Sequence, residues 1–137
     1  MAESAVHLDL IEGILRSVAG CLAGELVVFT DRPGEQRERR SPRINGFIPD
    51  VYAAELRGPS KLIGEAKAYK DFFSPHTTSQ LRAFFDFLRL QRAGVLMLAV
   101  PLALLPAAKC LLLRIASEEP AENVRLICCS ASLLVDV

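Results

Sequence analysis

The stretch Ile44–Lys67, with the sequence INGFIPDVYAAELRGPSKLIGEAK, decides how the rest of the chain can be arranged. Two short runs with alternating side-chain character flank Gly58 and Pro59, a pattern typical of two strands joined by a tight turn. Side chains alternate between the two faces of a strand, so Glu65 and Lys67 share one face. The stretch therefore predicts an antiparallel hairpin, with strands over residues 44–56 and 61–67 and charged side chains near one end.

The register of this hairpin determines which charged residues meet. If the hairpin is symmetric about the bond between Gly58 and Pro59, residue 50 lies opposite residue 67, and residue 52 lies opposite residue 65. Asp50, Glu65 and Lys67 then share one face, with the two carboxylates as diagonal neighbours roughly 7–8 Å apart. A hard divalent cation could bridge them. A shift of one residue would break the arrangement.

This spacing resembles the PD-(D/E)xK nuclease superfamily, whose members share the restriction-endonuclease-like fold. The matching residues are Pro49-Asp50 and Glu65-Ala66-Lys67, on two adjacent expected strands. The resemblance implies that Asp50 and Glu65 hold Mg²⁺ or Mn²⁺, with the carbonyl of Ala66 as a further ligand. It also implies that Lys67 takes part in hydrolysis of a phosphodiester bond. The alternative is a surface hairpin with ordinary solvated charges.

Residues 4–19 are expected to form the first helix, because their apolar side chains follow helical spacing: Val6, Leu10, Ile11, Ile14, Leu15 and Val18. Ser4 is the expected N-cap and Gly20 the expected end. Glu12 lies beside this stripe, and several branches of the nuclease superfamily carry a metal-binding acidic residue on the first helix. The resemblance makes Glu12 a candidate ligand; the alternative is a boundary residue with its carboxylate in water. His7 is interpreted as a helix-surface residue.

Glu25–Thr30 is rich in β-branched and aromatic residues and is expected to be the first strand. Asp31–Ser41 then reads as a charged loop. Between Arg32 and Arg43 there are five arginines and two glutamates, a local positive excess in a neutral chain. Because this segment leads directly into the Asp50 strand, we favour a phosphate-contacting arm over a solvated linker. The candidate contacts are Arg37, Arg39, Arg40 and Arg43.

Residues 68–75 are expected to be irregular, with Lys70 either touching a phosphate or exposed without a specific role. A helix is expected over residues 78–92, with one apolar face made by Leu81, Phe84, Phe85 and Leu88. Gln80 falls in its first turn, near the end of the Glu65 strand. Many superfamily members place a glutamine here, often as Gln-x-x-x-Tyr, but this chain has phenylalanine in place of the tyrosine. The resemblance makes Gln80 a candidate catalytic residue that orients metal, water or phosphate.

In the C-terminal part, the sequence predicts a buried strand over Gly94–Val100, a helix over Pro106–Ser117 and a strand over Val124–Cys129, with a short strand in the tail. The chain is therefore expected to be a single α/β domain, residues 1–137, with a mixed central sheet flanked by helices. The first six elements, over residues 4–100, resemble the α-β-β-β-α-β core of the nuclease superfamily, extended by a C-terminal helix and strand.

The composition narrows the class of protein. A chain of 137 residues with 51% hydrophobic content is expected to form one globular domain. Its formal net charge is zero, so nucleic-acid binding would need a local patch. The four cysteines lie among apolar neighbours without a Cys-x-x-Cys pair, which favours reduced thiols in the cytoplasm. Prolines interrupt the longest apolar run, so no membrane span is expected, and the N-terminus lacks the pattern of a secretion signal.

Two functions of different classes are compatible with these features. The first is a metal-dependent nuclease, with DNA preferred over RNA as the expected substrate, working as a homodimer because residues 102–113 and 126–137 are so apolar. The second is a catalytically silent domain of the same fold that binds nucleic acid or serves in an assembly. The intact set of Asp50, Glu65 and Lys67 favours the first, and the neutral charge favours the second. An unrelated small α/β protein with a chance motif is a weaker third interpretation.

Overall fold

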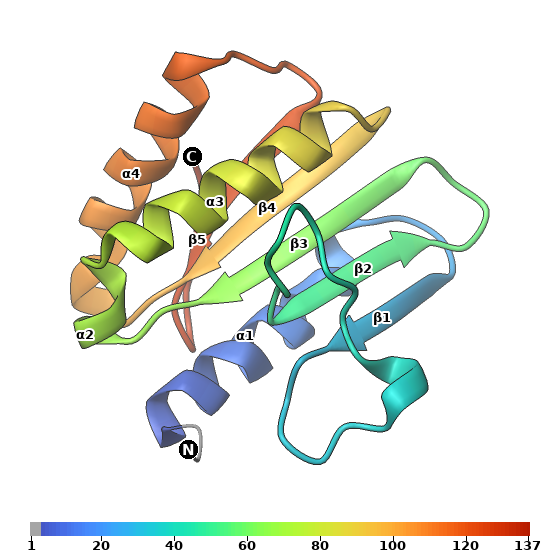
Figure 1. Ribbon diagram of the computed structural model, residues 1–137, viewed down its shortest axis with the longest axis horizontal. Helices are drawn as coiled ribbons and strands as arrows, with labels where there is room; N and C mark the ends of the chain where they lie inside the picture. Colours follow the sequence, from blue (N-terminus) through green and yellow to red (C-terminus); the bar gives the residue numbers. More distant parts are fainter. Residues whose placement is uncertain (1–3) are drawn as a thin grey trace.

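A six-stranded sheet runs through the part of the chain that the computed structural model describes, residues 4–137, with its strands side by side in chain order (Figure 1). The strands are β1 (Leu26–Thr30), β2 (Val51–Glu55), β3 (Ser60–Ala66), β4 (Ala93–Ala99), β5 (Val124–Cys129) and β6 (Leu134–Asp136). The helices are α1 (Ala5–Cys21), α2 (Tyr69–Phe72), α3 (Pro75–Arg89) and α4 (Leu105–Glu118), with 3₁₀ turns η1 (Arg37–Arg39) and η2 (Leu102–Leu104).

The strand directions explain where the helices lie. β1, β2 and β3 form an antiparallel meander, β3, β4 and β5 run parallel, and β6 returns antiparallel. A parallel pair of strands needs a crossover connection. The crossovers from β3 to β4 and from β4 to β5 move the same way across the sheet and are both expected to be right-handed, so α3 and α4 lie on the same face. α1 covers the opposite face (Figure 1). The expected α/β class, with a mixed sheet flanked by helices, is confirmed.

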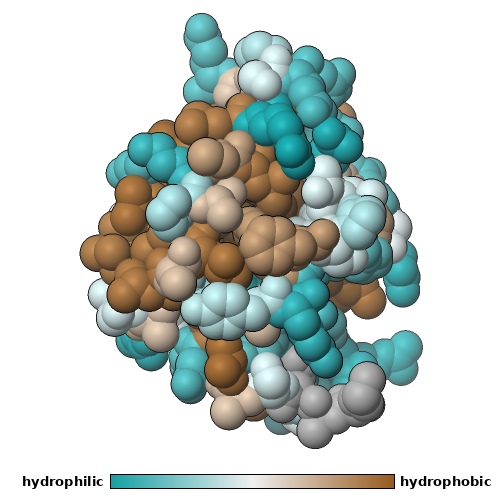
Figure 2. Space-filling view, turned by 90° about the vertical axis from the view of Figure 1, so that its left-hand side faces the viewer, coloured by the Kyte–Doolittle hydropathy of each residue, from teal (hydrophilic) through white to brown (hydrophobic). Residues whose placement is uncertain are grey.

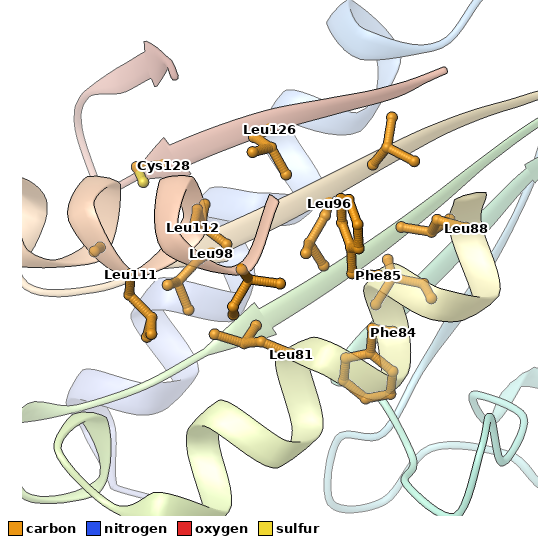
Figure 3. Close-up of a cluster of buried hydrophobic side chains, with 14 of the residues drawn as sticks. Leu81, Phe84, Phe85, Leu88, Leu96, Leu98, Leu111, Leu112, Leu126 and Cys128 are labelled. Carbon is orange, nitrogen blue, oxygen red and sulfur yellow. The ribbon is translucent and has the colours of Figure 1, made fainter. Parts of the chain in front are cut away.

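Two hydrophobic cores, one on each face of the sheet, hold the helices in place. Along the central strand β4, Leu96 and Leu98 face α3 and α4, whereas Val95 and Met97 face α1. Figure 3 shows the first core, in which side chains from both helices and two strands gather: Leu81, Phe84, Phe85, Leu88, Leu96, Leu98, Leu111, Leu112, Leu126 and Cys128. Burial on both faces makes the centre of the sheet a firm platform for residues at the strand ends.

The strand expected over residues 44–56 is shorter in the structure. β2 begins only at Val51, because Asn45 and Gly46, both with positive φ, form a tight turn ahead of it. An Asn-Gly pair favours such a turn, since both residues tolerate the left-handed conformation. The side-chain amide of Asn45 donates a hydrogen bond to the carbonyl of Ala83, which ties the turn to α3. The chain therefore approaches the sheet as a loop rather than as a strand.

The expected register of the hairpin is wrong by two residues. Val51 pairs with Gly64, which places Asp50 opposite Glu65 rather than opposite Lys67. The shift arises in the turn, where a side-chain carboxylate at the end of β2 accepts the first backbone N–H of β3 at 3.1 Å. Side chains alternate with a period of two, so a shift of two residues keeps each on its expected face. The three charged residues can therefore still meet.

Some helix boundaries also differ from those expected. α1 has Ser4 as its N-cap, as expected, but runs through Gly20 and ends at Cys21. The short helix α2 lies in the segment expected to be irregular. α3 begins at Pro75 rather than at residue 78, because proline fits the first helical position, where its missing N–H costs no hydrogen bond. The expected order α-β-β-β-α-β is present in α1, β1, β2, β3, α3 and β4, followed by α4, β5 and β6.

The apolar C-terminal half is only partly used in the core. α4 buries one face, made by Ala108, Leu111, Leu112 and Ile115. Other large apolar side chains of this half stay exposed: Leu102, Leu113, Leu133 and Leu134. Within residues 4–137, no helix is long and apolar enough to cross a membrane.

Close packing of α1 on β3 supplies a stability test. A Cβ atom added at Gly64 would lie 2.7 Å from Cγ2 of the buried Ile14, whereas one added at Gly20 meets no atom within 4 Å. Gly64→Ala should therefore lower the free energy of unfolding by about 1–3 kcal/mol in urea denaturation. Gly20→Ala should raise it by about 0.5–1 kcal/mol, since alanine favours a helix. Ile14→Ala combined with Gly64→Ala should cost less than the two single changes together. Equal effects of the two glycine changes would contradict this packing.

Candidate active site

Four polar side chains meet at the carboxyl end of β3. Asp50 immediately precedes β2, and Glu65 is the penultimate residue of β3. Lys67 directly follows β3, and Gln80 lies in the second turn of α3. Ligands of α/β proteins bind outside the carboxyl ends of parallel strands, and β3 is paired in parallel with β4 at this end. The structure thus brings together the four side chains that the sequence analysis assigned to catalysis.

Asp50 and Glu65 are joined through backbone N–H groups. The N–H of Ala66 donates to Oδ2 of Asp50 at 2.8 Å, and the N–H of Asp50 donates to Oε1 of Glu65 at 3.1 Å. These bonds lie one step beyond the last regular pair of the hairpin, so they depend directly on its register. Each carboxylate therefore has one oxygen held by the main chain of the neighbouring strand.

Lys67 lies between Glu65 and Gln80. Its Nζ is 3.3 Å from Oε2 of Glu65 and donates to Oε1 of Gln80 at 2.5 Å. Its backbone N–H donates to the carbonyl of Ala99, which continues the parallel pairing with β4 by one residue. The Lys67 side chain is 11% exposed, so the ammonium group is fixed at the rim of the site rather than extended into solvent.

His7 belongs to this group, although the sequence analysis interpreted it as a helix-surface residue. Its Nε2 lies 3.3 Å from Oδ2 of Asp50, and its side chain is only 15% exposed. A signal was present in the sequence: His7 precedes Leu10, Ile11 and Ile14 at helical spacing and so continues the buried stripe. The first turn of α1 therefore brings an imidazole to the same carboxylate that the hairpin positions.

The electrostatics of the site are governed by the burial of two carboxylates. Glu65 has a side chain only 4% exposed, and burial raises its pKa to about 8, with the neighbouring Asp50 charge acting in the same direction. The Lys67 cation opposes this shift but does not overcome it. The site therefore carries an unfavourable concentration of negative charge whenever both carboxylates are ionised.

The donors are of the type that Mg²⁺ and Mn²⁺ prefer. Asp50 and Glu65 place hard oxygen ligands together, and a bound cation would relieve the repulsion between them. Mg²⁺ commonly uses one or two carboxylates and completes its shell with water and substrate phosphate. Within the described residues, no group of three or more His, Cys, Asp or Glu side chains is arranged to hold a metal ion. Asp50 and Glu65 would supply two carboxylate ligands to such an ion.

Glu12, the other acidic residue expected at the metal site, is placed elsewhere. Its carboxylate accepts a hydrogen bond from Arg32 at 2.5 Å, and its side chain is 49% exposed. Arg32 also contacts Glu35, and the hydroxyl of Thr30 donates to Glu35 at 2.6 Å. Glu12 thus helps to fasten the loop after β1 to α1, and the structure does not bring it into the Asp50 group.

The basic residues expected to contact phosphate are on the surface. Lys70 is exposed on α2. The arginines are exposed on the loop between β1 and β2: Arg37, Arg39, Arg40 and Arg43. In Figure 1 the end of β3 lies between α2, on the left, and this loop, on the lower right. The segments that carry these basic residues therefore lie on two sides of the end of β3 in this view.

Comparison with known proteins does not add a family to this description. No protein-family model matches the chain, and searches of curated proteins and of solved structures found no match. A function must therefore be argued from the chemistry of the site.

The raised pKa of Glu65 predicts a pH dependence of stability. In the unfolded chain a glutamate has a pKa of about 4.3, whereas in the fold the pKa of Glu65 is about 8. Between these values the folded state binds the extra proton, so the free energy of unfolding should fall as the pH rises from 5 to 8. Urea denaturation in EDTA measures this dependence.

Glu65→Gln should flatten the curve, because the amide stays neutral throughout this range. Glu122→Gln, a change at an exposed glutamate, should keep the wild-type dependence and serves as the control. An identical slope in wild type and Glu65→Gln would show that Glu65 does not hold a proton in the folded state.

Proposed function

We propose that the protein is a metal-dependent nuclease that hydrolyses phosphodiester bonds, with DNA as the expected substrate ahead of RNA. The observation that carries the proposal is the buried group of Asp50, Glu65 and Lys67 at the carboxyl end of β3. The motif, the helix and strand order, and the position of Gln80 support assignment to the PD-(D/E)xK superfamily. Each of these is expected for a nuclease, and together they favour catalysis over a solvated surface hairpin.

Asp50 and Glu65 would hold the Mg²⁺ or Mn²⁺ ion, and the resemblance adds the carbonyl of Ala66. When bound, such an ion polarises a phosphoryl oxygen and makes water a better nucleophile. The chain itself prepares this site by fixing one oxygen of each carboxylate with a backbone N–H. His7 contacts the same oxygen of Asp50 that Ala66 contacts, so it helps to position that carboxylate.

Lys67 supplies positive charge close to the reacting phosphate. An ammonium group has three N–H donors. One donor is directed to Gln80 and another faces Glu65, which leaves one for a phosphate oxygen or the attacking water. A fixed cation of this kind stabilises negative charge that grows in the transition state. Gln80 would act through Lys67 as a positioning residue.

The arginine-bearing loop would bind the substrate backbone on the β1 side of the site. Arg37, Arg39, Arg40 and Arg43 are exposed, and the loop that carries them is fastened by the contacts among Thr30, Arg32 and Glu35. Phosphate contacts of this kind are independent of base sequence. Lys70 would supply a further contact on the opposite side.

A catalytically silent domain of the same fold remains the second candidate function. The formal net charge of zero favours it, since non-specific binding of nucleic acid usually relies on positive charge. Such a domain would bind nucleic acid or a partner subunit without cleaving it. We also place the protein in the cytoplasm, where reducing conditions would keep its four free thiols reduced.

Cleavage assays with plasmid, linear and branched DNA and with RNA, each with and without Mg²⁺ or Mn²⁺, test the nuclease. Lys67→Ala should reduce cleavage by about 10²–10³-fold, because the fixed cation is lost, while binding of Mn²⁺ and nucleic acid is kept. Glu65→Gln should lose both cleavage and Mn²⁺ binding in calorimetry, since it keeps the shape and removes the charge. Lys61→Ala is the control, because it removes a lysine from the other end of β3. Cleavage by Lys67→Ala at the wild-type rate, or cleavage without metal, would contradict the proposal.

We further propose a homodimer in which the exposed apolar residues of the C-terminal half are covered by the second copy. Light scattering at micromolar concentration should report twice the chain mass. Leu133→Glu with Leu134→Glu should shift the protein to monomer, because charge would be buried in the interface. Leu90→Glu, at a still more exposed position at the C-cap of α3, should not. A monomeric wild type would refute the dimer.

A further inference from the structure

A hollow between α2, the start of α3 and the face of α4 lies outside the Asp50 site. Its volume is about 550 Å³, within the roughly 300–1,000 Å³ of typical ligand sites. Aromatic and apolar side chains make up most of its wall, with one cationic side chain at α4: Phe72, Phe73, Pro75, Ala107, Leu111 and Arg114. Figure 2 looks onto this side of the molecule and shows apolar surface gathered over one part of it, with polar surface around.

Phe73 is the most exposed aromatic side chain at this hollow. It follows α2 directly and is 71% exposed, whereas its neighbour Phe72 is buried in the core. The two rings meet edge to face, with centroids 4.9 Å apart and an interplanar angle of 90°. The edge of the buried ring supports the exposed one, so Phe73 presents an aromatic surface to the hollow. An exposed aromatic ring beside a concave apolar wall is typical of a binding surface.

Arg114 gives the hollow a positive charge, which also acts on the carboxylate of Glu118, one helical turn further along α4. Its guanidinium forms no salt bridge with any residue of the described range 4–137. In contrast, Arg82 and Arg89 on the neighbouring helix α3 are paired with acidic residues. An unpaired guanidinium suits a phosphate, which it binds with two parallel N–H donors. Lys70, exposed on α2, adds a second cation between the hollow and the Asp50 site.

The hollow lies within reach of a strand bound at the candidate active site. Five residues separate Lys67 from Phe73, and four of them form α2, which is about 6 Å long. Even if fully extended, this connection could span no more than about 20 Å. A nucleic-acid strand with a rise of about 3.4 Å per nucleotide covers that distance with roughly six nucleotides or fewer.

We propose that this hollow binds an unpaired nucleobase of the substrate, stacked on Phe73, with a phosphate of the same strand held by Arg114. The inference rests on the proposed nuclease function and extends it by naming the substrate class. Bases of an intact duplex are stacked on each other and cannot reach an aromatic side chain, whereas bases of an unpaired strand can. The substrate is therefore a nucleic acid with a single-stranded segment near the cleaved bond.

An aromatic platform beside an exposed guanidinium that forms no salt bridge within the described residues matches the chemistry of a nucleotide better than that of an apolar peptide. An apolar peptide would use the apolar wall but would offer no anion to the Arg114 guanidinium. A base with its attached phosphate uses both features at once.

Equilibrium binding in EDTA, where no cleavage occurs, tests the inference. The probes are fluorescein-labelled oligothymidylate and oligouridylate of about 12 nucleotides, an abasic strand of the same length, and a blunt duplex. Phe73→Ala should weaken binding of the strands that carry bases roughly 5- to 100-fold and leave binding of the abasic strand and the duplex unchanged. The DNA and RNA probes show which of the two sugars the site accepts.

A second variant reports contact between a base and the hollow through tryptophan fluorescence. The chain contains no tryptophan, so Phe73→Trp introduces a single indole at the hollow and keeps an aromatic platform. This variant should bind oligothymidylate at least as tightly as wild type, and its fluorescence should change on addition of that strand but not of the abasic strand. Leu90→Trp, at a position 78% exposed on the far end of α3, is the control and should not respond.

Arg114→Gln tests the phosphate contact. It should weaken binding of strands with and without bases alike and reduce the slope of log K against log salt by about 0.7 for single strands. Arg92→Gln removes the same charge at the opposite end of α3 and should leave the slope unchanged.

The inference is overturned if Phe73→Ala binds oligothymidylate as Leu90→Ala does, or if Phe73→Ala changes only the oligomeric state. Loss of cleavage activity in no way decides it, because the binding assays contain no metal. If the wild-type protein cleaves nucleic acid but binds bases independently of Phe73, the proposed function stands and this inference is wrong. If the protein binds bases through Phe73 but cleaves nothing, this inference stands and the proposed function is wrong.

Discussion

The site depends on the two hydrogen bonds by which the Asp50 segment and the end of β3 hold each other. The N–H of Ala66 binds Asp50, and the N–H of Asp50 binds Glu65. Without these bonds, two carboxylates would be buried with too few partners, which costs several kcal/mol per charge in a protein interior. The raised pKa of Glu65 indicates that the compensation is incomplete. Burial and the Asp50 charge therefore favour a protonated Glu65, and the cation proposed for this site would relieve that repulsion.

The close approach of α1 to β3 determines which further groups reach this site. Gly64, beside Glu65, has no side chain, and Ile14 of α1 packs directly against it. The helix is thereby held close to the sheet, and its first turn brings His7 to Asp50. On the other face, α3 packs through Leu81 and Phe84, which sets Gln80 beside Lys67. Packing of uncharged side chains thus fixes the positions of the charged groups.

Much of this arrangement could be predicted from the sequence, and the errors have physical causes. The alternation around Gly58 and Pro59 predicted the hairpin, because period-two patterns reflect burial of one face. The register could not be predicted, because it depends on a side chain that accepts a backbone N–H within the turn. The error happened to be two residues, which preserves the faces, so the expected convergence survived.

The errors at Glu12 and His7 show a different limit. Helical spacing places both residues close to the buried stripe of α1, and sequence spacing alone cannot say on which side a partner lies. The partner of Glu12 is Arg32, from a loop whose path was not predictable. The partner of His7 is Asp50, which became visible only once the hairpin and the helix were placed together. Long-range contacts of this kind require the fold itself.

In a chain with zero net charge, the proposed binding of nucleic acid would rely on local positive regions. Acidic residues neutralise several arginines on α3, β5 and the loop after β1. The arginine loop on one side of the Asp50 site and Arg114 on the other remain as separate positive regions. A duplex offers phosphates to both regions but no base to Phe73, whereas a strand with unpaired bases can use all three. The aromatic platform, rather than total charge, would then decide between these substrates, since electrostatic contacts to phosphate are common to both.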